Sequence, residues 1–122
     1  MNLCNDGFLI EGGGLIRYTG GDSYIEIPPS VTRIGDRAFK WCSSLESIEI
    51  PSSVWRIGDR AFWNCESLER IEIPSSVTSI GNLAFGRCTA LTDIFYEGSY
   101  VKWKSLRVSI PSDTKVHCSI AE

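Results

Sequence analysis

A repeat of 23 residues constrains the fold of this chain more than any other feature. Segments 25–47, 48–70 and 71–93 carry the same residue type in many aligned columns. A fixed period of about 20 to 50 residues is typical of stacked units, because no single unit can bury its apolar face alone. The sequence therefore predicts a solenoid. Its aligned columns include Ile25, Ile48 and Ile71; Pro28, Pro51 and Pro74; Phe39, Phe62 and Phe85; and Cys42, Cys65 and Cys88.

The first half of each repeat is typical of a short strand. Leu45, Ile48 and Ile50 follow the L-x-x-L-x-L spacing of leucine-rich repeats. Ile48 and Ile50 are two residues apart, so both point to one face of a strand while Glu49 points to the other. Pro51 ends the strand, because proline has no N–H and fixes its own φ.

The second half of each repeat predicts a return path and a turn. Val54 and Ile57 are β-branched and favour a second short extended piece. Gly58 permits a turn, and the residue after it, Asp or Asn in all three repeats, is a typical N-cap for a short helical turn. Each repeat is thus predicted to be one coil made of a strand, a turn, a return segment and a helical turn.

Composition limits the classes of partner. The chain has 122 residues, with 12 Lys and Arg against 15 Asp and Glu and a formal net charge of −3. This length suits one domain, and 43% hydrophobic with 22% charged residues is the composition of a folded chain. A mildly acidic total gives no positive field to hold phosphates, so we expect no nucleic-acid partner. No apolar stretch approaches the roughly 20 residues that cross a bilayer, so we expect no membrane-spanning segment.

The pattern I-x-I-P-x-S-V-x-x-I-G-x-x-A-F-x-x-C-x-x-L, repeated over residues 25–93, resembles the BspA-type leucine-rich repeats of many bacterial and some protozoan surface proteins. The resemblance implies an α/β repeat fold: a short leucine-rich-repeat solenoid that forms one domain, residues 1–122. It also implies an adhesion-type protein that binds another protein, located on the cell surface or secreted. The sequence opens without a secretion signal, which leaves a cytoplasmic protein or a piece of a longer exported one as alternatives.

Both ends of the array are predicted to be caps, because a solenoid exposes apolar edges unless atypical units cover them. In residues 1–24, the segments 8–11 and 15–18 flank a run of three glycines, which predicts an N-terminal β-hairpin cap. Residues 25–93 are three full repeats. Residues 94–122 are predicted to be a degenerate repeat and an irregular C-terminal cap, closed by Tyr100, Trp103 and Leu106.

The cysteine column has three interpretations: a metal site, a redox relay or core packing. Metal ligands usually come as close pairs such as C-x-x-C, whereas single cysteines on successive coils form a row. Parallel Cβ vectors on coils about 4.8 Å apart disfavour a disulfide. We therefore favour buried free thiols at Cys42, Cys65 and Cys88, and we expect neither a metal nor a cofactor. The states of Cys4 and Cys118 stay open.

A column of glutamates is predicted to project from the concave sheet at one strand spacing. Like charges in such a row repel by a few tenths to about 1 kcal/mol per close pair. A solvated face left by duplication is the simpler interpretation, and a binding surface for a basic partner or a cation is the alternative. If the face binds a protein, we expect the contacts to come from this row and its flanks: Tyr24, Glu26, Glu49, Glu72, Phe95 and Glu97.

Three tryptophans break the repeat. Trp41, Trp55 and Trp63 stand in columns that elsewhere hold Thr, Lys, Gly, Asn or Arg, which are mostly surface residue types. Neighbouring exposed indoles can form an aromatic patch for a protein or a sugar ring. Partial burial against loops or against another copy of the chain explains them equally well.

Catalysis has little support in the sequence. His117 is the only histidine, and Cys118 beside it would point to the opposite face of a strand, so the two form no dyad. No nucleophile elbow, phosphate loop or zinc-protease motif occurs. We therefore predict a non-catalytic protein-binding module. The alternatives are a carbohydrate-binding surface that uses the tryptophans, and a structural spacer that self-associates weakly.

Overall fold

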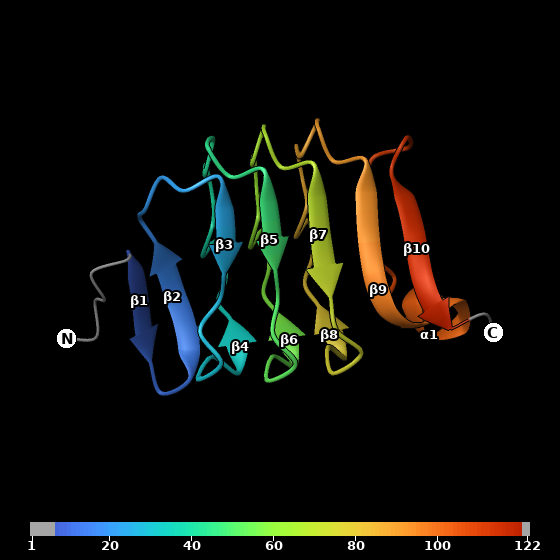
Figure 1. Cartoon of the computed structure of the whole chain (residues 1–122), viewed down its shortest axis with the longest axis horizontal. Helices are drawn as coiled ribbons and strands as arrows, with labels where there is room; N and C mark the ends of the chain where they lie inside the picture. The colour runs from blue at the N-terminus through green and yellow to red at the C-terminus, as the bar shows by residue number, and fades with distance from the viewer. Residues whose placement is uncertain (1–6, 121–122) are drawn as a thin grey trace.

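The computed structural model describes residues 7–120, which wind into a solenoid with two five-stranded sheets (Figure 1). This confirms the leucine-rich-repeat solenoid that the sequence predicted. Its elements in chain order are β1 (Phe8–Glu11), β2 (Gly14–Tyr18), β3 (Tyr24–Glu26), β4 (Arg33–Ile34), β5 (Ser47–Glu49), β6 (Arg56–Ile57), β7 (Arg70–Ile73), β8 (Ser79–Ile80), β9 (Asp93–Ser99), α1 (Tyr100–Ser105) and β10 (Lys115–Ile120).

Two sheets run the length of the solenoid. The front sheet, nearest the viewer in Figure 1, consists of β3, β5, β7, β9 and β10, all parallel. The return sheet consists of β4, β6 and β8, joined through β2 to the hairpin strand β1. The 23-residue period sets the register, because each coil adds one strand to both sheets. One row of the front sheet is Ile25, Ile48, Ile71 and Ile94, and the next is Glu26, Glu49, Glu72 and Phe95.

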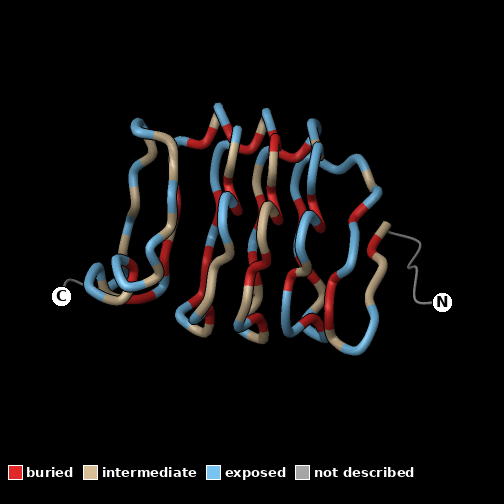
Figure 2. The backbone as a smooth tube through the Cα atoms, turned by 180° about the vertical axis from the view of Figure 1, so that it is seen from behind, coloured by how far each residue is buried: buried red, intermediate tan, exposed pale blue. Residues whose placement is uncertain are grey.

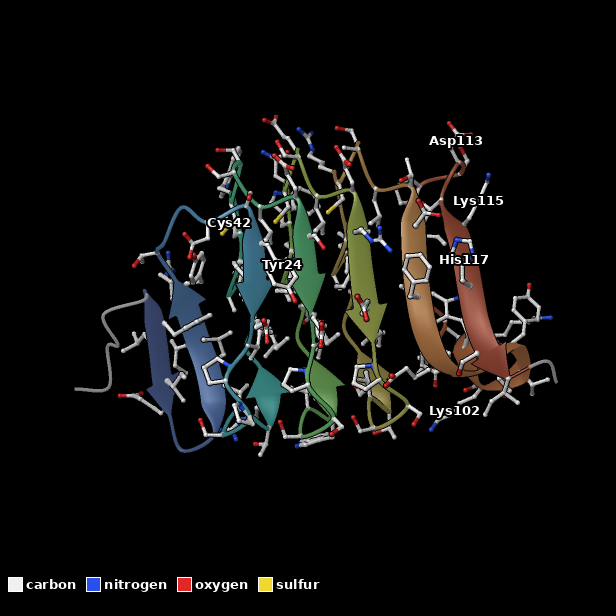
Figure 3. The ribbon with its side chains drawn as sticks, in the orientation of Figure 1. Tyr24, Cys42, Lys102, Asp113, Lys115 and His117 are labelled. Carbon is white, nitrogen blue, oxygen red and sulfur yellow. The ribbon has the colours of Figure 1, made fainter. Side chains whose placement is uncertain are left out.

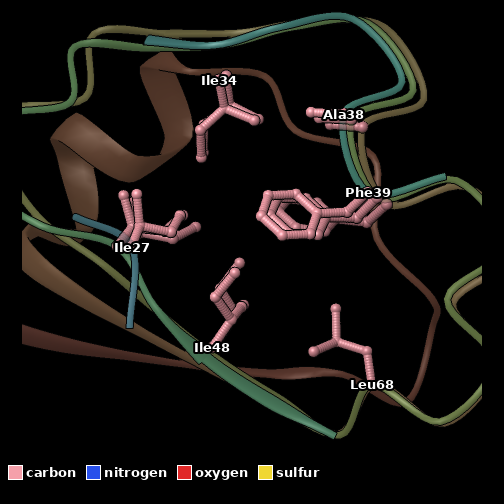
Figure 4. Close-up of a cluster of buried hydrophobic side chains, with 14 of the residues drawn as sticks. Ile27, Ile34, Ala38, Phe39, Ile48 and Leu68 are labelled. Atoms are coloured by element: carbon pink, nitrogen blue, oxygen red, sulfur yellow. The ribbon is translucent and has the colours of Figure 1, made fainter. Parts of the chain in front are cut away.

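The interior is built from the apolar columns of the repeat (Figure 4). The rings of Phe39, Phe62 and Phe85 stack at centroid distances of 4.9 and 5.5 Å, with interplanar angles of 6° and 11°. All three side chains are buried. The row of rings continues through Tyr18 of β2 to Phe8 of β1, with centroid distances of 5.5 and 5.0 Å. The aligned phenylalanine column therefore lies in one continuous hydrophobic interior.

Polar side chains tie each coil to its neighbour. The Oδ1 atoms of Asp36 and Asp59 accept hydrogen bonds of 2.8 Å from the backbone N–H groups of Asp59 and Asn82, one coil further on. The Ser53 hydroxyl donates to the Val31 carbonyl of the preceding coil at 2.7 Å. These recurring residues satisfy backbone groups that coil stacking would otherwise leave without partners.

The helical turn predicted in each coil is wrong. Segment 35–42 instead forms two successive turns, each closed by a backbone N–H···O=C bond of 3.2 Å. The third residues of these turns, Arg37 and Trp41, have left-handed φ angles of 60° and 66°, which interrupt a helix. The Asp carboxylate that was predicted to cap a helix bonds to the next coil instead. The same two positions are left-handed in the following coils, at Arg60, Asn64, Leu83 and Arg87.

The cysteine column lines the interior as free thiols. Cys65 and Cys88 are buried, and each donates its S–H to a backbone carbonyl of the preceding coil at 3.1 Å. Contact with the Cys88 thiol and burial both raise the pKa of Cys65. Cys42 is half-buried, and its burial raises its pKa to about 11. Cys118 is also free and half-buried, whereas Cys4 lies outside the described residues.

The two ends differ from the repeats. The predicted hairpin forms from β1 and β2, paired antiparallel. At the other end Trp103 of α1 is buried with its ring 5.4 Å from that of Tyr96, and Leu106 packs against the core. Tyr100, expected to help close this end, is 53% exposed instead. The described part of residues 94–122 includes α1 and β10, so it is more regular than the sequence indicated. A capping role for either end stays a prediction.

We expect Phe62→Ala to lower the free energy of unfolding by about 3 to 5 kcal/mol, because it opens a cavity in the middle of the aromatic stack. Urea unfolding followed by circular dichroism measures the change. Thr78→Ala, an exposed substitution in the next coil, should stay within about 0.5 kcal/mol of the parent. Equal losses in the two variants would contradict the central role of the stack.

We expect Leu83→Gly to raise the free energy of unfolding by up to about 1.5 kcal/mol. Leu83 is 41% exposed and has a φ of 56°, a conformation that costs a residue with a β-carbon about 1 to 2 kcal/mol. Glycine removes this cost but loses more backbone entropy, roughly 0.5 to 1 kcal/mol, on folding. Leu83→Val should be less stable than the parent, because β-branched residues tolerate positive φ poorly. Thermal and urea unfolding would rank the stabilities of the three proteins. A valine variant more stable than the glycine variant would refute the argument.

Candidate functional site

The candidate site is the outward face of the front sheet, shown with its side chains in Figure 3. Strand residues alternate between faces, so the isoleucines of β3, β5 and β7 point inward and the glutamates beside them point outward. Glu26, Glu49 and Glu72 pair in register, one strand apart, and all three are exposed. The structure thus brings the predicted acidic row together, at a strand spacing of about 4.8 Å.

Tyr24 joins this row from the first strand. Its hydroxyl donates a hydrogen bond of 3.2 Å to Glu49 Oε1, although the two residues belong to different coils. Desolvation of the hydroxyl, together with the charges of Glu26 and Glu49, raises the pKa of Tyr24. The hydroxyl therefore stays protonated at neutral pH and remains a donor to the carboxylate. This bond holds the Glu49 side chain across the face of the sheet.

An aromatic and cationic cluster occupies the other end of the face. The ring of Phe95 stacks on the imidazole of His117 at 4.6 Å and 13°. The Arg70 guanidinium carbon lies 4.7 Å from the centroid of the Phe95 ring. His117 Nε2 is 2.7 Å from Asp93 Oδ1, the only acid–base pair within 4 Å in residues 7–120. The hydrogen bond from His117, and a second from Thr92, lower the pKa of the Asp93 carboxyl.

Sequence reasoning placed Phe95 on this face but missed the contributions of Arg70 and His117. Arg70 occupies the column of Tyr24 and Ser47, so the 23-residue alignment could have revealed that it faces outward. His117 lies on β10, which pairs with β9 although its sequence departs from the repeat. The repeat alignment therefore gave no signal for it.

Two adjacent hollows lie on this face. One has a volume of about 220 Å³ and is lined by Glu49, Glu72 and Glu97, with Pro51 and Pro74 among its other residues. The second has a volume of about 170 Å³. Glu72 and Glu97 line both hollows, and the second also includes Phe95 and His117. An acidic hollow therefore lies next to a more apolar, aromatic one.

The three tryptophans lie away from the front face. Trp41 and Trp55 are 60% and 48% exposed, while Trp63 is half-buried. The backbone N–H of Trp41 donates to the backbone carbonyl of Trp63 at 2.9 Å, and this bond joins the turns that carry the two residues. Within residues 7–120 no ring contact links any two of the three indoles. An aromatic patch formed by all three stays a prediction.

Within residues 7–120, no group of three or more His, Cys, Asp and Glu side chains is arranged to hold a metal ion. The same part of the chain has no helix with the length and hydrophobicity that a bilayer crossing requires.

The sequence and the fold of this chain both resemble those of leucine-rich repeat proteins. The family described as "BspA type Leucine rich repeat region (6 copies)" matches residues 18–109. Among curated proteins, none matches the chain.

Several solved structures of leucine-rich repeat proteins are similar to this chain in fold. A leucine-rich repeat protein of T. pallidum is 25% identical with a TM-score of 0.65, over 87% of this chain and 56% of that chain. One from Eubacterium ventriosum is 29% identical with a TM-score of 0.67, over 76% of this chain and 28% of that one. One from Bacteroides ovatus is 30% identical with a TM-score of 0.58, over 91% of this chain and 34% of that one. The chain therefore spans 28% to 56% of the length of these three structures.

The matched segment contains the three full repeats and parts of both flanks, well over half of the chain. Its register, its stacked phenylalanines and its parallel front sheet are those of a repeat array. This chain is a member of the BspA-type leucine-rich repeat family.

Proposed function

We propose that this chain is a non-catalytic module that binds a basic segment of another protein on the outward face of its front sheet. The observation that carries the proposal is the row of exposed carboxylates held at strand spacing beside an aromatic cluster. The contact residues are those predicted from the sequence: Tyr24, Glu26, Glu49, Glu72, Phe95 and Glu97.

Charge and rigidity both support a basic partner. Adjacent carboxylates in the row repel one another, and a cationic partner relieves that repulsion when it binds. Glu49 and Glu72 stand on β5 and β7, which pair with a strand on each side, and Glu26 stands on the edge strand β3, which pairs with β5. The backbone is therefore already ordered and loses little entropy on binding. The acidic hollow fits a lysine or arginine side chain, and the neighbouring Phe95–His117 stack fits the apolar residues beside it.

Family membership supports a location and a type of partner. BspA-type repeats resemble those of many surface proteins, so we expect this module to act on the cell surface or after secretion. There it would bind a protein of a host or of a neighbouring cell, as an adhesion protein does. What supports this part of the proposal is the family alone.

We expect Glu49→Lys combined with Glu72→Lys to weaken binding of a lysine-rich peptide at least about 100-fold, or about 3 kcal/mol, because attraction becomes repulsion at the centre of the face. Surface plasmon resonance at low salt measures the affinity. Glu11→Lys combined with Glu66→Lys makes the same change in net charge at exposed carboxylates outside the front sheet, and should retain most of the binding. Equal losses in the two double variants would remove the front face from consideration.

We expect His117→Asn to raise the pKa of the Asp93 carboxyl toward its ordinary value, because the hydrogen bond that favours the carboxylate is lost. In the parent, this lowered pKa means that the Asp93–His117 contact stabilises the fold above the unfolded pKa of Asp93. That contribution disappears as the pH falls through the folded pKa. Carboxyl ¹³C chemical shifts recorded against pH report the change. An unmoved Asp93 titration would show that the contact does not set its protonation.

A further inference from the structure

A second surface lies on the turns of the coils, behind the front sheet. These turns are on the near side of the molecule in Figure 2, which views it from behind. Basic and aromatic side chains gather on these turns beside Asp36, Asp59 and Leu83, whereas the row on the front face is acidic. We call this surface the Arg–Trp patch, and it consists of Arg37, Lys40, Trp41, Arg60, Trp63 and Arg87.

Trp63 holds two arginines of the patch in place. The guanidinium carbons of Arg60 and Arg87 lie 5.4 and 5.7 Å from the centroid of its ring. The indole itself lies over Gly86, so closely that a β-carbon there would clash with the ring. Arg60 and Arg87 come from successive coils, so the glycine in the third coil allows one indole to organise both side chains.

The hydrogen-bond donors of these guanidinium groups are available. In residues 7–120 no carboxylate lies within 4 Å of the charged nitrogens of Arg37, Arg60 or Arg87. Asp36 and Asp59, in the same turns, each use one carboxylate oxygen on a backbone N–H of the next coil. The patch therefore presents positioned guanidinium groups that lack a protein anion, and guanidinium groups bind carboxylates with paired hydrogen bonds.

The backbone of the patch carries strain. Arg37, Trp41, Arg60 and Arg87 all have left-handed φ angles between 52° and 66°. Gly or Asn fits such positions more easily, and each bulky residue there costs about 1 to 2 kcal/mol. The same two positions are also left-handed at Asn64 and Leu83, so this conformation belongs to the coil and determines where the side chains of the patch leave the backbone.

The complementary surface is present on the same chain. The front face carries Glu26, Glu49 and Glu72 at the spacing of one strand per coil, and the turns of the patch follow each other with the same coil spacing. We propose that the Arg–Trp patch binds the acidic front face of a second copy of this chain. The inference rests on the proposed function, in that it names a partner for the same front face.

Such a contact joins two different surfaces, so a pair of copies keeps one free acidic face and one free patch. It is therefore heterologous, and it forms open chains of copies rather than closed dimers unless the rotation between copies closes a ring. Because the contact depends on exposed charges, it should weaken as the ionic strength rises and the Debye length falls from about 10 Å at 0.1 M to about 3 Å at 1 M.

Two charge-reversed variants test the proposal. In the first, Arg60→Glu and Arg87→Glu make the patch acidic; in the second, Glu49→Lys and Glu72→Lys make the front face basic. Sedimentation velocity at low salt should show concentration-dependent oligomers for the parent and monomers for each variant alone. An equimolar mixture of the two should form oligomers again, because every contact then joins an acidic surface to a basic one. Restored association also shows that both variants are folded.

Several results would overturn the proposal. A parent that stays monomeric up to ~1 mM, where an association of about −4 kcal/mol is half complete, would exclude it. So would a mixture that stays monomeric, or parent oligomers that survive the Arg60→Glu and Arg87→Glu changes. Binding of a sulfated polysaccharide by a monomeric parent, lost in the first variant, would assign the patch to an anionic glycan instead. If the monomeric parent still binds the lysine-rich peptide, only the self-association fails and the proposed function stands.

Discussion

Stacking of one coil on the next is the interaction on which the rest of the structure depends. The strands of a coil are only two to four residues long through the repeats, too short to be stable in isolation. What holds them is the column of Phe39, Phe62 and Phe85, whose rings stack from one coil to the next. Full burial of one such side chain contributes about 1.5 to 3 kcal/mol, and every coil adds further apolar columns. Stability is therefore a property of the array rather than of any repeat.

The same stacking determines what the outside can do. When interior columns align, the residues between them must align as well, so a glutamate in the repeat becomes a row of carboxylates on the front sheet. The turns behind the sheet are aligned in the same way, and the bonds from Asp36 and Asp59 hold successive turns together. The rigidity that the core requires thus produces, without further cost, surfaces whose charges are fixed in position. Such surfaces suit binding better than catalysis, because an open sheet offers little to shift the pKa of one carboxylate selectively.

Much of the fold and part of the site could be predicted from the period alone. Residue columns identified the interior and the acidic row, because a parallel sheet places residues 23 apart side by side. The predicted helical turn was wrong. An Asp shortly before an Ala-Phe pair favours a helix cap locally, but in this fold the Asp carboxylate accepts a hydrogen bond from the backbone of the next coil. His117 was missed because β10 is outside the repeat, and its contact with Asp93 exists only through strand pairing. Local sequence patterns thus gave the wrong prediction, or none, where contacts between coils determine the structure.

The residues that depart from the repeat are the ones that distinguish this surface from that of a uniform array. A substitution in an interior column affects packing in three coils at once, whereas a turn position tolerates Lys, Trp or Gly, as residues 40, 63 and 86 show. Even at the turn positions, the residue in one coil limits the residue in the next, since the Trp63 ring occupies the space that a side chain at Gly86 would need. Arg60 and Arg87 then pack on that ring from two different coils. A repeat protein therefore acquires an individual surface through a few coupled substitutions between neighbouring coils, and in this chain those substitutions concentrate on the turns behind the front sheet.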